Sequence, residues 1–105
     1  MIRIPTDRVP THPGEMLQEE FLKPIGLTPR ALSEALHVPH AEIEELVAGK
    51  RGLTASLALR LAKFFVTSVG FWMNLQLVWD VYHVQQVEAR ALEDIQPYQM
   101  LRGRG

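Results

Sequence analysis

The sequence contains no cysteine, which excludes a disulfide framework, a thiolate nucleophile and a cysteine-based zinc site. This absence fits a reducing compartment, and we expect the protein to be cytoplasmic. Long apolar runs are missing too. The most apolar segment is VGFWMNLQLVWDVYHV, and the polar residues Asn74, Gln76, Asp80 and His83 interrupt it, so no membrane span is predicted. The first residues, MIRIPTDRVPT, lack an apolar run of signal-peptide length.

An excess of charge of either sign is also missing. The formal net charge is −1 at pH 7, which argues against a generally basic protein that coats nucleic acid. Any contact with nucleic acid must come from a local basic patch, most effectively one that a dimer presents twice. The sequence also lacks an HExxH motif, a glycine-rich phosphate loop and a serine with an evident histidine and aspartate partner set. We therefore expect no enzymatic activity and no cofactor.

What the chain does contain is a pattern of five helices joined by short loops. Its 105 residues are the size of one domain, and 47% of them are hydrophobic, as is usual for a globular protein. Apolar residues recur at helical spacing, and no strand-like alternation is present, so the predicted fold class is all-α. The helices are predicted to begin near residues 12, 28, 39, 54 and 68 and to end near residues 25, 36, 47, 65 and 90. Thr28, Thr54 and Ser68 are the expected caps of the second, fourth and fifth helices. Glycine in AGKRG is available for a left-handed cap at the end of the third helix.

The predicted helical domain covers residues 12–90. Residues 1–11 are expected to form a flexible arm and residues 91–105 a poorly ordered tail, since both contain proline and little hydrophobic pattern. His12 is a candidate cap for the first helix because proline follows it directly. Histidine is a poor cap, so Thr11 is the alternative.

The second and third predicted helices form the distinctive unit of the chain. Only a few residues separate them, and the small side chain of Ser33 would let their backbones approach closely. The apolar spacing is that of a helix-turn-helix and runs through Leu32, Leu36, Val38, Ile43 and Leu46. Such a turn leaves the amino-terminal half of the third helix free to enter a major groove. The residues alone therefore predict a helix-turn-helix domain.

A more specific resemblance lies in three stretches. The chain resembles the HigA family of bacterial antitoxins, which are phage-repressor-like helix-turn-helix proteins, in HPGEMLQEEFLKPIGLTPRALSEALHVP, AGKRGLTASLALRLAKFF and TSVGFWMNLQLVWDV. The resemblance extends over residues 12–82 and is most specific in HPGE, GKRGLT and FWMNLQ. It implies a five-helix phage-repressor-like domain with a long C-terminal dimerisation helix. It also implies a dimeric antitoxin that represses its own operon and silences a HigB-like toxin, a ribosome-dependent messenger-RNA endonuclease of the RelE type.

The third predicted helix and the loop after it, PHAEIEELVAGKR, carry the candidate DNA contacts. Ala41 can touch a thymine methyl group, and His40 can donate to a base or a phosphate. Thr28, Lys50 and Arg51 are the best candidates for phosphate contact. The alternative for the two basic residues is a solvated charge without a partner, since many surface ion-pairing groups contribute nothing.

Three glutamates of this helix have the same charge as the DNA phosphates. Similar repressors often have glutamate at the position of Glu44, which we interpret as a solvated side chain beside the groove. Glu45 lies where similar repressors have a base-reading side chain. A carboxylate can accept from the cytosine amino group, so Glu45 is either a reader or a bystander. Glu42 departs from the family, which tends to have a basic or small polar residue there, and we expect phosphate to repel it and the DNA affinity to be modest.

Two histidines raise further possibilities. His37 occupies a turn position where similar repressors commonly have glycine, and histidine tolerates the left-handed conformation better than most residues. His40 and Glu44 are four residues apart and would share one helix face. Two ligands do not make a metal site and no third is evident, so no metal is predicted.

The last predicted helix has two apolar stripes. The broader one comprises Phe71, Trp72, Leu75, Val78, Trp79 and Tyr82, and the second comprises Met73, Leu77, Val81 and Val84. A surface helix of a monomer needs only one apolar face, so the second stripe is predicted to be a homodimer interface. The alternative is a helix that is buried all round within a single domain.

The leading hypothesis is thus a dimeric antitoxin whose partners are double-stranded operator DNA, a HigB-like toxin and a second copy of itself, with no membrane partner. The sequence does not show the toxin surface; the candidates are the arm before His12 and the first helix, with the tail after Arg90 as a weaker candidate. One alternative is a stand-alone helix-turn-helix transcriptional regulator without a toxin. Another is a protein-interaction module whose DNA affinity has decayed, as Glu42 would suggest.

Overall fold

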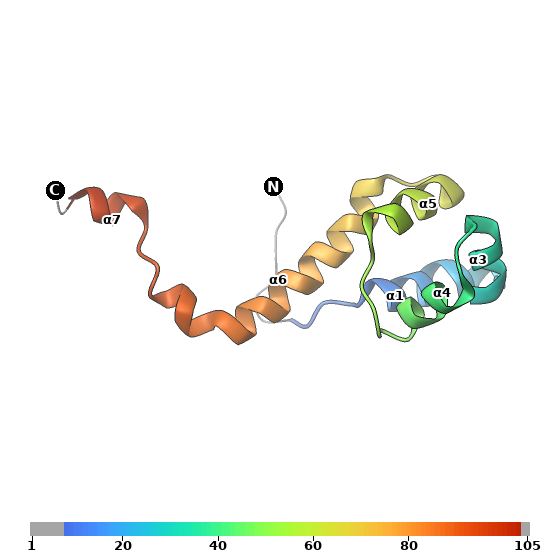
Figure 1. Ribbon diagram of the computed structural model, residues 1–105, viewed down its shortest axis with the longest axis horizontal. Helices are drawn as coiled ribbons and strands as arrows, with labels where there is room; N and C mark the ends of the chain where they lie inside the picture. Colours follow the sequence, from blue (N-terminus) through green and yellow to red (C-terminus); the bar gives the residue numbers. More distant parts are fainter. Residues whose placement is uncertain (1–7, 104–105) are drawn as a thin grey trace.

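The computed structural model describes residues 8–103, and within this range every regular element is helical (Figure 1). The all-α class and the five predicted helices are therefore confirmed. Most of the predicted amino-terminal arm, residues 1–7, lies outside the described residues. None of the described helices is long and apolar enough to cross a membrane.

The first predicted helix is continuous but changes its winding. It consists of α1 (Pro13–Met16), the π-helical turn η1 (Leu17–Leu22) and α2 (Lys23–Ile25). A π-turn joins residues five apart, and the Lys23 N–H donates to the Gln18 carbonyl in this way. The winding brings Leu17 and Leu22 to one side of the helix, and both are fully buried.

Helices α3 (Pro29–Leu36) and α4 (His40–Val47) form the predicted helix-turn-helix. His37 ends α3 in the left-handed conformation, with φ 59°, so the histidine does take the backbone conformation that glycine commonly supplies. Ser33 is fully buried, and its carbonyl accepts from the Val38 N–H at 3.0 Å, which closes the turn. The small serine thus lets the two helices meet, as the sequence predicted.

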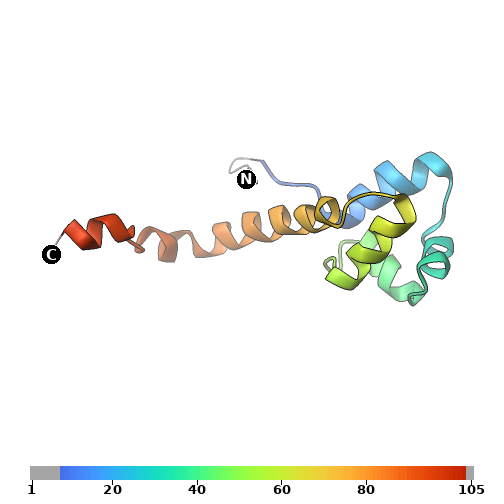
Figure 2. The ribbon, with the colours of Figure 1, turned by 90° about the horizontal axis from the view of Figure 1, so that it is seen from above.

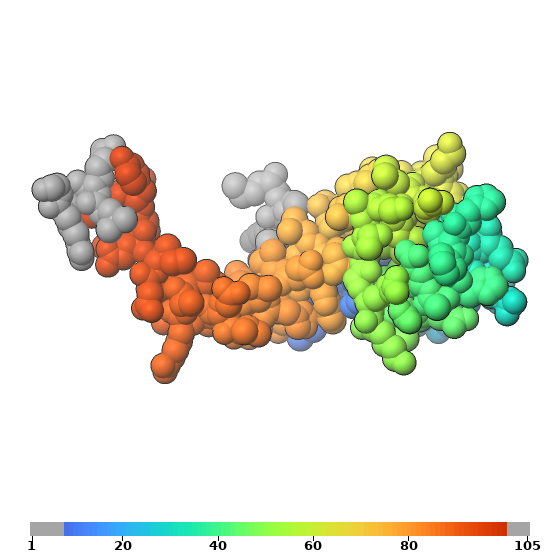
Figure 3. Space-filling model, viewed as in Figure 1, coloured from blue at the N-terminus to red at the C-terminus, as the bar shows by residue number. Residues whose placement is uncertain are grey.

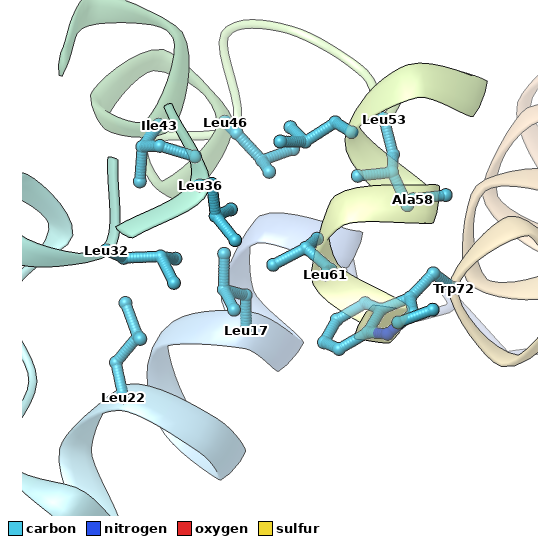
Figure 4. Close-up of a cluster of buried hydrophobic side chains, with 12 residues drawn as sticks. Leu17, Leu22, Leu32, Leu36, Ile43, Leu46, Leu53, Ala58, Leu61 and Trp72 are labelled. Carbon is cyan, nitrogen blue, oxygen red and sulfur yellow. The ribbon is translucent and has the colours of Figure 1, made fainter. Parts of the chain in front are cut away.

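One apolar core joins these helices to the rest of the domain (Figure 4). Its buried members are Leu17, Leu22, Leu32, Leu36, Ile43, Leu46, Leu53, Leu57, Ala58, Leu61, Ala62 and Trp72. The indole N–H of Trp72 donates to the Thr67 hydroxyl at 2.7 Å, so burial of the ring leaves no polar atom unpaired. Phe21 packs against Phe65 and Trp72, with ring centroids 4.9 and 4.8 Å away.

Helices α5 (Ala55–Phe65) and α6 (Val69–Glu93) begin at the predicted caps. The hydroxyl groups of Thr54 and Ser68 each accept from the backbone N–H three residues later, at 3.2 and 3.0 Å. Val66 ends α5 with φ 54°, a left-handed conformation that is unusual for a β-branched residue. Both helices therefore start where the sequence predicted, for the reason that it predicted.

Helix α6 projects well beyond the core and makes the molecule elongated, 61 × 22 × 22 Å (Figures 1 and 2). It ends at Glu93, slightly beyond the end predicted near Arg90. A further helix, α7 (Tyr98–Gly103), follows at the far end of the molecule (Figure 3). The carbonyl of Pro97 accepts from the Met100 N–H at 3.0 Å, so the proline that suggested a tail instead precedes a helical turn. The predicted tail thus contains a helix, and its poor order stays a prediction.

Gly14 marks a close approach of α1 to α4. A Cβ atom added to Gly14 would lie 1.7 Å from the carbonyl oxygen of Leu46 and 3.0 Å from the α-carbon of Val47. Both neighbours are backbone atoms of a helix, which cannot move aside as a flexible side chain can. The glycine in HPGE is therefore required by packing.

We expect Gly14→Ala to lower the free energy of unfolding by about 3 kcal/mol, because the methyl group would force α1 away from α4. Urea denaturation followed by circular dichroism would measure the loss. Gly70→Ala is the matched control, since the nearest atom to a Cβ there is the Ser68 hydroxyl oxygen at 4.0 Å. Equal losses in the two variants would show that the close approach is not the reason for Gly14.

Candidate nucleic-acid interface

Within the helix-turn-helix, the first turn of α4 is accessible to a ligand. Pro39 precedes it in an extended conformation, with φ −60° and ψ 144°, and no side chain caps the helix. The positive end of the helix dipole is thus left for an acceptor outside the chain, such as a phosphate. Ala41 is exposed. His40 is half-buried, and its Nε2 lies 3.6 Å from a carboxylate oxygen of Glu34.

Two other predicted residues belong to the helix-turn-helix, Thr28 at the start of α3 and Glu44 on α4. Thr28 is exposed, and its hydroxyl oxygen accepts from the Ala31 N–H at 3.1 Å. This bond caps α3 and leaves the hydroxyl hydrogen able to donate to a phosphate. Glu44 is exposed, as expected for a solvated side chain. Within residues 8–103 no three side chains of metal-binding type gather, so His40 and Glu44 have no third ligand there.

The basic loop after α4 is held by a Schellman motif. Gly49 takes the left-handed conformation, with φ 75°. The Lys50 N–H donates to the Glu45 carbonyl at 2.8 Å, and the Gly49 N–H donates to the Leu46 carbonyl at 3.0 Å. The glycine cap predicted from the sequence is therefore confirmed, and it fixes the backbone on which Lys50 and Arg51 sit.

Arg51 turns back from this loop onto the glutamates of α4. Its Nε and Nη2 atoms lie 3.0 and 2.8 Å from the same oxygen of Glu45, and its Nη1 lies 4.0 Å from Glu42. The Glu42 side chain is only 22% exposed, so it lies beside a cation and does not stand free in solvent. The two glutamates that seemed to oppose DNA are thus partly neutralised within the chain, which the sequence analysis did not foresee.

The far end of the loop is tied to α6 by Gln76. Its side-chain oxygen accepts from the Leu53 N–H at 2.6 Å, and its side-chain nitrogen donates to Asp80 at 2.8 Å. Gly52 lies against the same side chain, where an added Cβ atom would be 3.0 Å from the Gln76 nitrogen. The sequence analysis treated Gln76 only as an interruption of an apolar run. Its place in the FWMNLQ motif was the signal that could have identified it.

Comparison with known proteins decides the family. No protein-family model matches the chain. It is 47% identical over 75 residues to virulence-associated protein I of Dichelobacter nodosus, over 71% of this chain and 69% of the relative. It is 38% identical over 93 residues to antitoxin HigA-1 of Vibrio cholerae, over 86% of this chain and 88% of the relative. The chain belongs to the HigA family of antitoxins.

The fold of this chain also matches that of a HigA antitoxin. The structure of the Pseudomonas aeruginosa antitoxin HigA with the higBA promoter matches this chain with a TM-score of 0.81 and 37% identity, over 85% of this chain and 98% of that one. The three motifs that carried the resemblance now have physical roles in this HigA-family protein. HPGE seats α1 on α4, GKRGLT forms the fixed basic loop, and FWMNLQ supplies buried Trp72 and the loop contact of Gln76.

The predicted dimer stripe lies along α6. Leu77 and Val84 expose 40% and 49% of their surfaces. Val81 is half-buried and lines a shallow groove of about 400 Å³ together with Val84 and Leu92. Met73 is half-buried and also packs against the core of its own chain, so its part in an interface stays a prediction. The alternative of a helix buried all round is wrong, since Trp72 is the only buried residue of α6.

His12 joins α1 to the loop and to α6. Its Nδ1 accepts from the Gly14 N–H at 2.9 Å, so His12 is the cap of α1 and the alternative, Thr11, is wrong. The imidazole also meets the Trp79 ring edge-on, with centroids 4.8 Å apart. The backbone of Arg51 lies near the imidazole and raises its pKa. One side chain thus contacts three elements around the candidate interface.

The cap requires a neutral imidazole, because a protonated Nδ1 cannot accept a hydrogen bond. Burial lowers the pKa of His12 below its ordinary value of 6.5, and the positive charge of a protonated His83 would lower it further. The carboxylates of Glu15 and Asp80 and the Arg51 backbone act in the opposite direction, without cancelling the effect of burial. The folded protein therefore favours the neutral form more than the unfolded chain does.

Since the pKa is lower in the folded state, stability from His12 is present above about pH 6.5 and is lost as the pH falls through the folded-state pKa. We expect the free energy of unfolding of the wild type to decrease more steeply than that of His12→Asn between about pH 6.5 and pH 5, because asparagine can cap without titrating. Urea titrations at several pH values measure both profiles. Parallel profiles would contradict this role.

Proposed function

We propose that this protein is the antitoxin of a type II toxin–antitoxin module. It binds operator DNA as a dimer and represses its own operon, and it neutralises a HigB/RelE-like mRNA endonuclease by binding it directly. The observation that carries the proposal is the uncapped first turn of α4 beside a fixed basic loop, in a chain similar over most of its length to a HigA solved with the higBA promoter. None of these activities requires catalysis by the antitoxin.

In the proposed complex, the first turn of α4 enters the major groove. His40 and exposed Ala41 meet base edges there, and Glu45 accepts from a cytosine amino group. Thr28 and Lys50 contact phosphates, since both are exposed and have a donor, Thr28 at the start of α3 and Lys50 in the loop after α4. With few cationic contacts per chain, the affinity depends on two chains binding together.

The dimer proposed here forms through α6. Leu77, Val81 and Val84 follow one another at helical spacing on the part of α6 that leaves the core, and the groove beside them is apolar. Symmetric packing of two such helices would cover this stripe and present two copies of α4 to two half-sites. Met73 is the residue of the stripe nearest the core, where the core of each chain would meet the interface.

The proposed toxin contact involves the amino-terminal segment. Pro10 and Thr11 border an apolar hollow of about 330 Å³ that Met16, Phe71 and Val78 also line. Phe71 is 38% exposed, and an aromatic side chain at the rim of a hollow is a favourable anchor for a protein partner. This surface is separate from the residues proposed to contact DNA, so one chain can serve both partners.

DNA binding can be tested with a fluorescent duplex from the promoter of the protein's own gene, titrated at several salt concentrations. We expect two chains per duplex and an affinity that falls steeply with salt. Lys50→Ala should weaken binding to all sequences alike and reduce the salt slope by about two per dimer, because one phosphate contact is lost from each chain. Arg90→Ala, which removes one charge from the far part of α6, is the matched control. Absence of binding even at low salt would exclude the repressor function.

Toxin neutralisation can be tested by co-expressing the protein with the product of the adjacent gene. We expect a small, basic toxin to co-purify with it and the growth arrest caused by that toxin to be relieved. Lys50→Ala should retain this activity, because its loop lies outside the proposed toxin surface. A protein that binds its operator but neither binds nor neutralises such a product would be a stand-alone regulator.

A further inference from the structure

Arg51 and Glu45 form an ion pair at the candidate DNA interface. Neither a phosphate contact by Arg51 nor a base contact by Glu45, taken alone, explains this pair. We propose, on the basis of the DNA binding proposed above, that Arg51 is a positioning residue for Glu45: it neutralises and orients the carboxylate so that Glu45 reads a cytosine. Arg51 thereby contributes to sequence specificity, whereas a phosphate contact would contribute to affinity alone.

The geometry leaves half of the carboxylate available. Two donors of Arg51, Nε and Nη2, lie 3.0 and 2.8 Å from the same oxygen, Oε1 of Glu45. No other side chain in residues 8–103 donates to this carboxylate, and the Glu45 side chain is 45% exposed. Its second oxygen, Oε2, can therefore accept from the amino group of cytosine while Oε1 stays bound to Arg51.

The backbone on either side of Arg51 is fixed, so the arginine side chain starts from a defined position. The Schellman motif at Gly49 fixes the start of the loop, and Gln76 fixes its end through the Leu53 N–H. The imidazole of His12 lies near the backbone of Arg51 and feels its influence. A side chain whose root is immobilised loses less conformational freedom when it binds, which favours a defined direction for Glu45.

The electrostatics of the DNA groove explains why Glu45 would need to be paired with Arg51. A bare carboxylate carried into the groove would face the phosphates and lose its water, and an unpaired charge is costly to desolvate. Paired with Arg51, Glu45 enters as a neutral unit. Glu42 lies 4.0 Å from Nη1 and competes with any phosphate for the guanidinium. Lys50 lies in no ion pair among the described residues, so it remains the cation of this loop that can serve phosphate.

A double-mutant cycle on the full chain tests this assignment. The probes are the promoter duplex and duplexes with single base pairs replaced at each position of a half-site. Glu45→Ala should lose about tenfold of discrimination at one C·G position, and Arg51→Ala should lose it at the same position, with no further loss in the double variant. Arg51→Lys keeps the charge but cannot place two donors on the same oxygen of Glu45. It should therefore retain affinity for unrelated duplexes and still lose the discrimination at the C·G position.

Lys50→Ala is the matched control and should lower affinity for every duplex equally. Unfolding midpoints of all variants show whether each one is folded, and Glu45→Gln, which keeps the shape and one acceptor, provides a second substitution at the reading position. Additive effects of Arg51→Ala and Glu45→Ala, or a uniform loss over all duplexes from Arg51→Ala, would overturn the positioning role and leave DNA binding intact. Failure of the wild type to bind any duplex would overturn the proposed function and, with it, this role.

Discussion

The close approach of Gly14 to the backbone of Leu46 is the contact on which the rest of the site depends. Helix α4 has only eight residues, and a helix this short is not stable by itself. Its direction is set by the burial of Ile43 and Leu46 on one side and by the seat of α1 against its last turn. Both neighbours of Gly14 are backbone atoms, so the distance between α1 and α4 is fixed at this contact. A contact between side chains could adjust and would not fix it. The first turn of α4 is therefore presented by a rigid support.

The loop after α4 belongs to the same rigid support. It is closed at its start by the Schellman motif around Gly49 and held at its end by Gln76 of α6, while His12 contacts it from the amino-terminal end of α1. The surface proposed to bind DNA and the helix proposed to form the dimer are thus joined directly by the hydrogen bond from Leu53 to Gln76. In such an arrangement the spacing of two α4 helices in a dimer and the position of the basic loop are determined together.

The three glutamates of α4 show why charge in a sequence cannot be judged residue by residue. Glu44 is exposed as predicted, but Glu42 and Glu45 lie beside Arg51, six residues beyond Glu45. Helical spacing predicts partners three or four residues apart, and a pair across a left-handed turn at Gly49 falls outside that rule. The apparent conflict between an acidic helix and a polyanionic ligand is thus reduced by a contact that only the folded loop creates.

Local sequence was enough to predict the five helices, their caps at Thr28, Thr54 and Ser68, and the left-handed turns at His37 and Gly49, because these depend on residues within one turn of each other. The left-handed conformation of Val66 was not predicted, since a β-branched residue rarely adopts it. Apolar spacing likewise determined which side of each helix enters the core. The contacts between elements became visible only in the folded chain: Gly14 with Leu46, Gln76 with Leu53, His12 with Trp79. These contacts depend on how helices far apart in the chain cross, and spacing along one helix contains no information about that crossing.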